Sequence, residues 1–310
     1  MKILITGGAG YIGSILVPML LDKGNEIVVI DNFMYGQTPL LESCINKNLS
    51  IIRGDVRNKN LLLRELKEAD AILPLACLTG APICEKDPVG ANQINFEAIK
   101  YLADNKSKNQ LLIFPCTNSG YGVGEEGIFC DEDTPMRPVS IYGKLKVELE
   151  KYLLQKGDCL TFRFATVFGM SPRMRLDLLV NDFTYRAVVD KTLVLFEAHF
   201  KRNYLHVRDA SRAFIHAIDN YSSMAGEPFN VGLSDANLSK KELCETIQKT
   251  VSDFKFIISE IGKDPDQRNY LISNEKIEKY GFSTSVGLQA GIEELVKGFQ
   301  VMRRNQFSNI

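Results

Sequence analysis

Short apolar runs alternate with longer amphipathic stretches along the first half of the chain. Runs typical of buried parallel strands lie at residues 2–6, 26–30, 49–52, 69–75, 111–114 and 159–164. The segments between them carry the wider spacing of apolar positions that helices show. Because strands and helices alternate through residue 165, we predict an α/β fold with a doubly wound, Rossmann-type parallel sheet covered by helices on both faces.

The regular alternation ends after Phe168. Residues 171–190 form a charge-rich stretch with helical patterning, and Ser239 with Glu242 forms a capping box that opens a helix to about Thr250. We therefore predict one domain over residues 1–168 and a smaller α/β domain over most of residues 169–310, with a segment near 203–221 packing back on the first. Since no Gly/Ser-rich linker separates them, the cleft between them is the expected ligand site.

A glycine-rich turn follows the first predicted strand. The sequence MKILITGGAGYIG spaces Gly7, Gly10 and Gly13 as GxxGxxG between that strand and an apolar helical stretch. Glycines here allow a tight turn and a close approach of backbone to a pyrophosphate, and the helix N-terminus attracts the anion. An ordinary strand–turn–helix with tolerant glycines is the alternative, since this spacing alone is weakly specific.

Asp31 ends the second predicted strand, near the distance from Gly13 that is expected for an acid contacting the adenosine ribose. A carboxylate accepts hydrogen bonds from the ribose hydroxyls and repels a 2′-phosphate. No arginine follows immediately. The pattern favours NAD over NADP as cofactor, whereas a surface acid at a strand end is the alternative.

Candidate catalytic residues follow the fifth predicted strand. Thr117 lies just past that strand, and Tyr142 and Lys146 are four residues apart on a predicted helix that begins near Pro138, so they share a face. A nearby ammonium lowers the pKa of a phenol. Tyr142 could then take a proton from an alcohol while hydride leaves the same carbon, with Thr117 bonding the reacting oxygen. A helix-face tyrosine beside a solvated lysine is the alternative.

Composition narrows the class of protein. The chain has 310 residues, with 37 Lys and Arg against 38 Asp and Glu, so its net charge of −1 indicates neither a nucleic acid nor an anionic membrane as partner. No signal segment or membrane-length apolar run is evident. Seven cysteines lack CxxC or Cys/His spacing. They indicate reduced thiols in the cytoplasm, with no metal site expected.

These motifs together resemble the extended short-chain dehydrogenase/reductase family that acts on nucleotide sugars. The matching parts are TGGAGYIG, Asp31, the Asp55–Val56 pair, Thr117, YGKLK and RNYLHVRD, in the order of the family and over nearly the whole chain. The resemblance implies a Rossmann fold, NAD, a nucleotide-sugar substrate and a homodimer formed through helices near residues 88–107 and 138–156.

The resemblance also implies roles for individual residues. It makes Thr117, Tyr142 and Lys146 the catalytic set. The implied NAD contacts are Gly7, Gly10, Tyr11, Ile12, Gly13, Asp31, Asn32, Asp55, Val56, Leu75, Ala76, Cys77, Asn95, Tyr142 and Lys146. The implied substrate contacts are Gly80, Asn118, Ser119, Arg175, Asn181, Arg202 and Arg268.

The residues after Thr117 discriminate among activities of the family. The 4,6-dehydratases carry acids here and the glucuronate decarboxylases a glutamate nearby, whereas this chain has Asn118 and Ser119, which do not titrate as carboxylates. Oxidation at C4 remains, followed either by release of the keto sugar or by reduction on its other face, as in a 4-epimerase. A non-catalytic NAD-binding regulator is disfavoured because the catalytic set is complete.

Four longer stretches resemble the branch of the family that oxidises GDP-linked heptoses for bacterial capsule synthesis. They are TNSGYGVGE, ATVFGMSPRMRLDLLVNDFTYRA, FKRNYLHVRD and GLSDANLSKKEL. This likeness implies a GDP-linked substrate and favours the dehydrogenase over the epimerase. Gly120 replaces a bulkier apolar residue, and we expect it to widen the floor of the sugar pocket. Arg173 and Arg175, with Asn181, are expected on a helix that faces the cleft.

Overall fold

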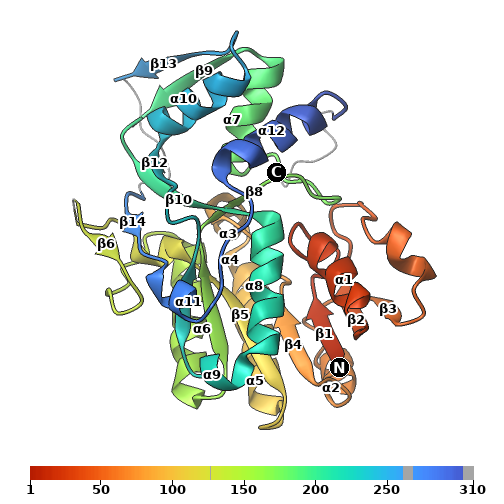
Figure 1. Ribbon diagram of the computed structural model, residues 1–310. Coiled ribbons are helices and arrows are strands. Elements are labelled where there is room, and N and C mark those ends of the chain that lie inside the picture. The colour runs from red at the N-terminus through yellow and green to blue at the C-terminus, as the bar shows by residue number, and fades with distance from the viewer. Residues whose placement is uncertain (126, 261–267, 303–310) are drawn as a thin grey trace.

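A seven-stranded parallel sheet forms the core of the lower part of the molecule in Figure 1. The computed structural model describes residues 1–125, 127–260 and 268–302, so residues 261–267 and 303–310 of the predicted second domain lie outside the described residues. The strand order is β11-β7-β5-β4-β1-β2-β3, and every neighbouring pair is parallel. The strands are β1 (Lys2–Thr6), β2 (Glu26–Asp31), β3 (Leu49–Arg53), β4 (Ala71–Pro74), β5 (Leu111–Thr117), β7 (Leu160–Phe164) and β11 (Pro228–Val231).

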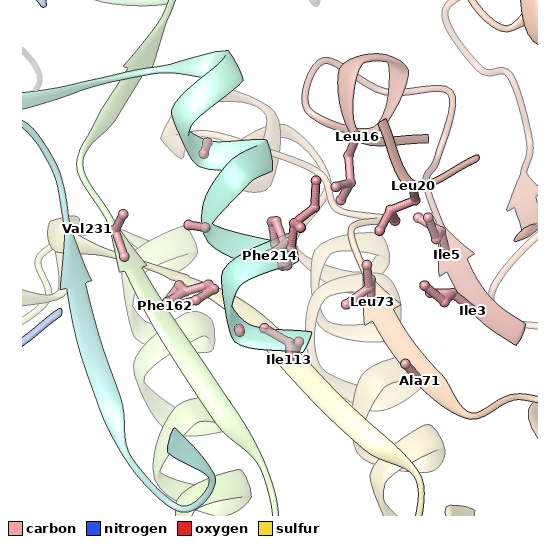
Figure 2. Packing of buried hydrophobic residues seen from close by; sticks show 14 of the residues in the cluster. Ile3, Ile5, Leu16, Leu20, Ala71, Leu73, Ile113, Phe162, Phe214 and Val231 are labelled. Carbon is pink, nitrogen blue, oxygen red and sulfur yellow. The ribbon is translucent and has the colours of Figure 1, made fainter. Parts of the chain in front are cut away.

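Helices cover both faces of this sheet, which confirms the predicted fold class. One face carries α1 (Gly13–Asp22) and α8 (Val207–Asp219), and the other carries α2 (Lys59–Leu66), α5 (Ala98–Asn105) and α6 (Ile141–Lys156). Because successive strand side chains point to opposite faces, Ile3 and Ile5 pack under α1 and α8 while Leu4 packs under the other layer. Figure 2 shows Phe214 of α8 and Leu16 of α1 over the sheet.

Two elements of this layered core come from beyond Phe168. Helix α8 lies on the sheet beside α1, and β11 pairs with β7 as the edge strand. The sequence did not predict β11, since a four-residue strand outside the regular alternation gives little periodicity. The chain therefore returns to the first layer after it has entered the second half.

Outside the central sheet, the remaining strands form small sheets, most of them from the second half of the chain (Figure 1). The additional strands are β6 (Phe129–Cys130), β8 (Thr166–Phe168), β9 (Thr192–Phe196), β10 (Lys201–His206), β12 (Asn237–Ser239), β13 (Lys255–Ser259) and β14 (Leu271–Ile272). The further helices and turns are η1 (Leu41–Ile45), α3 (Ala81–Lys86), α4 (Pro88–Asn92), η2 (Gln93–Glu97), η3 (Asn118–Tyr121), α7 (Leu179–Val189), α9 (Tyr221–Met224), α10 (Lys240–Thr250), α11 (Glu275–Lys279) and α12 (Leu288–Phe299). The predicted capping box is confirmed at the start of α10.

The helix expected from Ser171 begins later than predicted. Helix α7 starts at Leu179, and residues 171–178 form a loop. The Ser171 hydroxyl bonds the Tyr11 carbonyl (2.7 Å), and the Arg173 amide bonds the Ser14 hydroxyl (3.4 Å). Side-chain bonds of this kind offer the backbone an alternative to a helix. Arg173 and its neighbour Arg175 therefore lie on a loop rather than on a helix face.

Candidate active site

A cavity of about 820 Å³ lies at the carboxyl ends of the central strands. In open parallel sheets, ligands bind where the order of connection reverses, which here is between β1 and β4. Segments from both halves of the chain line the cavity. The predicted site residues all line it except Asn95, Asn118 and Asn181.

The glycine turn forms one end of the cavity. Gly7 has φ 71°, and a Cβ there would lie 2.5 Å from the Ala76 nitrogen, so the turn requires glycine. A Cβ on Gly13 would lie 2.5 Å from the Gly8 carbonyl oxygen. Helix α1 begins at Gly13, and Ile12 at its N-cap carries no side-chain acceptor for the first N–H groups. This backbone cradle suits the pyrophosphate of a dinucleotide.

Asp31 stands at the end of β2 and faces the same cavity. Its carboxylate oxygens accept from the backbone N–H groups of Ala9 (3.0 Å) and Phe33 (2.8 Å), which fix its orientation. Burial raises the pKa of Asp31, while those two hydrogen bonds and the charge of Arg173 act in the opposite direction. An oriented acceptor at this strand end fits the hydroxyls of an adenosine ribose.

We expect Asp31→Ala to weaken binding of NAD by about tenfold and binding of NADP by much less. In the predicted role, the carboxylate would bond the ribose hydroxyls of NAD and repel the 2′-phosphate of NADP, so the substitution would remove an attraction for NAD and a repulsion for NADP. Isothermal titration with both cofactors measures the ratio. Asp22→Ala, an exposed carboxylate on α1, is the control. Equal losses for both cofactors would contradict the assigned role.

The candidate catalytic residues lie together beside the strand ends. Thr117 ends β5, and its hydroxyl donates to the Ser119 hydroxyl (2.9 Å). Tyr142 and Lys146 lie in the first turns of α6 and line the cavity. Lys146 donates from Nζ to the Pro115 carbonyl (2.8 Å). Oxidation of an alcohol requires such a grouping of proton acceptor, hydroxyl donor and cation beside a dinucleotide.

The sequence-based expectation that an ammonium lowers the pKa of Tyr142 is wrong for the structure as described. Burial raises the pKa of Tyr142 well above its usual value, and the charge that opposes this is that of Arg175. Lys146 instead directs Nζ at the Pro115 carbonyl and lies 4.5 Å above the ring of Phe114. Burial therefore favours the neutral phenol of Tyr142 over its anion.

The three predicted residues that do not line the cavity are buried behind its wall. Asn95 accepts from the Leu78 amide (2.8 Å) and donates to the Leu78 carbonyl (2.9 Å) from within the π-helical turn η2. Asn181 accepts from the Gly169 amide (3.0 Å) and donates to the Arg175 carbonyl (2.9 Å). These two asparagines therefore hold backbone that forms the cavity wall.

The surroundings of Asn118 and Gly120 differ from those predicted. Asn118, the third of those buried residues, is 1% exposed, and its amide has no hydrogen-bond partner among the described residues. Gly120 does not widen the floor of the cavity, because it packs against Val147 and Met136, where an added Cβ would lie 2.7 Å and 2.8 Å from side-chain atoms. The expectation for Gly120 is wrong, since its Cα faces the underside of α6.

Arginines from separate segments converge on the second-half side of the cavity. Arg175 pairs with Asp177, with 3.2 Å between Nε and Oδ1. Arg202 of β10 is 3% exposed and donates to the Lys201 carbonyl (3.0 Å), and Arg268 donates to the Ser119 hydroxyl. A guanidinium matches two oxygens of a phosphate with its planar fork. This side of the cavity can therefore hold a second, diphosphate-bearing ligand.

Some cavity residues were not among the predicted site residues. They include Phe33, Met34, Tyr35, Gln37, Thr166, Val167, Asp177, Asp182 and Lys240. Those that follow Asp31 directly could have been predicted, because the loop after β2 must start at the same sheet edge. The residues from 166 to 240 reach the cavity only through the packing of the second half.

This geometry defines the class of protein as an NAD-dependent enzyme of the short-chain dehydrogenase/reductase type. Residues 3–232 match the sequence model of the NAD dependent epimerase/dehydratase family, and the chain belongs to that family. NAD is its cofactor, as predicted, and its relatives act on nucleotide sugars. No helix in the described ranges is long and apolar enough to cross a membrane.

Characterised relatives differ in the reaction named for them. UDP-glucuronic acid decarboxylase 1 of Arabidopsis thaliana is 26% identical over 97% of this chain and 70% of its own length. UDP-glucose 4-epimerase of Lactobacillus helveticus is 26% identical over 86% of this chain and 87% of its own. The crystal structure of the UDP-glucose 4-epimerase of Thermus thermophilus in complex with NAD superimposes with a TM-score of 0.81 at 25% identity, covering 97% of this chain and 99% of that one.

Proposed function

We propose that this enzyme oxidises C4 of a nucleotide-linked sugar, and that its substrate is GDP-D-glycero-α-D-manno-heptose. The product is the 4-keto sugar, for capsular or other surface polysaccharide synthesis. The observation that carries the proposal is a cavity in which Thr117, Tyr142 and Lys146 meet while positions 118 and 119 hold no carboxylate. Elimination or decarboxylation needs a further acid or base at that place, whereas oxidation does not.

Tyr142, Thr117 and Lys146 have separate roles in the proposed oxidation. Tyr142, once deprotonated, accepts the proton of the C4 hydroxyl, and Thr117 donates a hydrogen bond to the same oxygen. NAD, which Gly7, Gly10, Gly13 and Asp31 would hold, would supply the acceptor for the hydride from C4, so that the carbon is oxidised by two electrons and the hydroxyl becomes a carbonyl. Lys146, held on the Pro115 carbonyl, supplies a positive charge beside the reacting groups.

The nucleotide side of the substrate is assigned to the converging arginines. Arg175, Arg202 and Arg268 line the cavity. Their guanidinium groups suit the diphosphate of any sugar nucleotide. The choice of GDP and of a heptose rests on the likeness of the four longer stretches to the heptose-oxidising branch of the family.

We expect Arg268→Ala to raise the dissociation constant of the sugar nucleotide about tenfold with little change for NAD. A guanidinium that bonds a phosphate oxygen contributes a charge-assisted hydrogen bond, and this variant removes it. Titration with GDP and with NAD measures both constants. Ser119→Ala, which keeps the guanidinium but removes its hydroxyl partner, separates loss of charge from loss of orientation. An unchanged constant for GDP would show that Arg268 does not bind the diphosphate.

A 4-epimerase is the alternative, and the UDP-glucose 4-epimerases among the relatives favour it. Both activities use the same oxidation at C4. They differ in whether the keto sugar leaves or turns over within the cavity and is reduced on its other face. Residues that merely line the cavity do not distinguish these outcomes, so a product assay is required.

Proton NMR of the products tests the proposal. The purified enzyme is incubated with NAD and GDP-D-glycero-α-D-manno-heptose, and in parallel with GDP-mannose and with UDP-glucose. A 4-keto sugar with stoichiometric NADH from the heptose alone supports the dehydrogenase. A C4 epimer without net NADH identifies the epimerase, and no reaction with any of the three would refute the proposed substrate.

We further propose that the enzyme is a cytoplasmic homodimer that pairs through α4–α5 and α6. These helices lie beside each other on one face of the sheet, and the family resemblance implies a dimer interface there. All seven cysteines are free, as expected in a reducing compartment. Light scattering after size exclusion tests the oligomer, and a monomeric mass at micromolar concentration would contradict it.

A further inference from the structure

Buried hydrogen bonds connect the loop of residues 169–173 to the glycine turn and the start of α1. The Tyr11 hydroxyl donates to the Gly169 carbonyl (2.6 Å), and the Ser171 hydroxyl donates to the Tyr11 carbonyl (2.7 Å). The hydroxyls of Ser14 and Ser171 are 2.8 Å apart. The Arg173 amide donates to the Ser14 hydroxyl (3.4 Å). Arg173 therefore begins beside the first turn of α1, where the pyrophosphate of NAD is expected.

The side chain of Arg173 runs along the cavity toward the ribose-binding end. Its guanidinium carbon lies 4.2 Å from the ring centroid of Tyr35, which follows Asp31 in the loop after β2. Arg173 is 2% exposed, and both it and Tyr35 line the cavity. The charge of Arg173 also opposes the rise in the pKa of Asp31, which places the guanidinium near that carboxylate.

The neighbouring arginine lies near both Arg173 and the candidate catalytic tyrosine. Arg175 pairs with Asp177, and its charge opposes the rise in the pKa of Tyr35 as well as that of Tyr142. Arg173 lies between the helix N-terminus and Asp31, which is the stretch that the adenosine half of a dinucleotide would span.

We propose that Arg173 is a cofactor-binding residue whose guanidinium contacts the pyrophosphate of NAD, with Tyr35 as the platform on which it stacks. A guanidinium can match two phosphate oxygens at once, and the Arg173 guanidinium is oriented by stacking on the Tyr35 ring and by a hydrogen bond from Nη1 to the Met174 carbonyl (2.5 Å). The second half of the chain would then close over the adenosine half of the cofactor, and release of NAD would require the Arg173–Tyr35 contact to open.

Binding of cofactor fragments to the full-length protein, freed of bound nucleotide, tests this proposal. Isothermal titration with ADP-ribose, adenosine and GDP separates the pyrophosphate from the base and from the sugar-nucleotide site. We expect Arg173→Ala to weaken ADP-ribose by about ten- to a hundredfold. Arg173→Lys should recover part of that loss, because it keeps the charge but not the fork. Adenosine and GDP should bind as they do to the parent protein.

Substitution of Tyr35 tests the same Arg173–Tyr35 contact through its aromatic partner. Tyr35→Leu should weaken ADP-ribose severalfold and speed release of NAD, whereas Tyr35→Phe, which keeps the ring, should not. Arg64→Ala, on the exposed side of α2, is the control for loss of one positive charge. Unchanged ADP-ribose affinity in Arg173→Ala, or a loss confined to GDP, would overturn the proposal.

Discussion

Replacing Tyr142 by Phe should abolish turnover while the protein keeps NAD. In the proposed reaction the deprotonated Tyr142 oxygen accepts the proton of the sugar hydroxyl, and Phe removes that oxygen while it preserves the ring and its packing. Removing a general base slows a reaction by about 10²- to 10⁴-fold. Product formation measured by NMR gives the rate, and titration with NAD gives the affinity. Tyr280→Phe, in a half-exposed tyrosine away from the cavity, is the control. Normal turnover in Tyr142→Phe would refute the assignment.

The raised pKa of Tyr142 sets the direction of the pH dependence. The base form of a phenol exists only above its pKa, and burial moves that pKa upward. The oxidation rate should therefore rise with pH across the neutral and mildly alkaline range. Because the charge of Arg175 opposes the shift, Arg175→Met should move the profile further to alkaline pH. A rate that falls as pH rises from 7 to 9, in protein that stays folded, would contradict Tyr142 as base.

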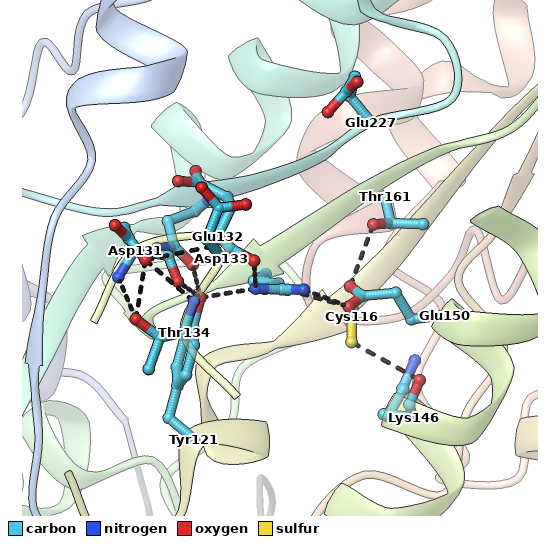
Figure 3. A network of polar contacts seen from close by, with 12 residues as sticks. Cys116, Tyr121, Asp131, Glu132, Asp133, Thr134, Lys146, Glu150, Thr161 and Glu227 are labelled. Carbon is cyan, nitrogen blue, oxygen red and sulfur yellow. Dashed lines mark hydrogen bonds and ion pairs between the residues drawn. The ribbon is translucent and has the colours of Figure 1, made fainter. Parts of the chain in front are cut away.

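Breaking the buried ion pair between Glu150 and Arg163 should cost about 3–5 kcal/mol of unfolding free energy. The two side chains are 2% and 7% exposed, and Arg163 Nε donates to Glu150 Oε1 at 2.9 Å. Figure 3 shows Glu150 also accepting from Thr161, and the drawn network reaching Tyr121. In Arg163→Met, the carboxylate of Glu150 remains buried without its partner.

The same pair connects the catalytic helix to the sheet. Glu150 lies one turn after Lys146 on α6, while Arg163 lies on β7 and donates to the Tyr121 hydroxyl (2.8 Å) and the Glu132 carbonyl (2.9 Å). Loss of the pair should therefore loosen the seating of α6 as well as lower stability. We expect a reduced rate of turnover in the variant at temperatures where it is still folded.

Urea denaturation measures the stability change. The double variant Glu150→Gln with Arg163→Met should recover part of the loss, because it leaves no uncompensated charge. Arg64→Met, in the exposed pair with Glu65, should change the unfolding free energy by less than about 1 kcal/mol. A loss for Arg163→Met no larger than that of Arg64→Met would contradict the structural role of the pair.

Sequence and structure agree most closely where function depends on local backbone. Gly7 and Gly13 are required by contacts within the turn or with the adjacent strand end, and Asp31 must emerge beside them because β1 and β2 are parallel neighbours. Tyr142 and Lys146 share a helix face through their spacing alone. These positions could be predicted because the relevant geometry spans few residues.

The wrong predictions, and the features that were not predicted, depend on packing between residues far apart in the sequence. The direction of Lys146 Nζ depends on Pro115, and the space around Gly120 depends on Met136 and Val147. Arg173 lies on a loop because Ser14 and Tyr11, far away in the chain, bond its segment. Such contacts leave no periodic signal in a single sequence, so pattern and propensity do not reveal them.

The amino-acid sequence by itself determined the parallel sheet, the glycine turn before α1 and the positions of Thr117, Tyr142 and Lys146, because strand burial, glycine geometry and helix spacing are local properties. Only the tertiary structure decided that β11 completes the sheet, that burial raises the pKa of Tyr142, and that Arg173 meets Tyr35 over the cofactor end of the cavity. Each of these features depends on contacts between segments that are far apart in the sequence. Such contacts pair strands, exclude water from a side chain or bring a charge near it.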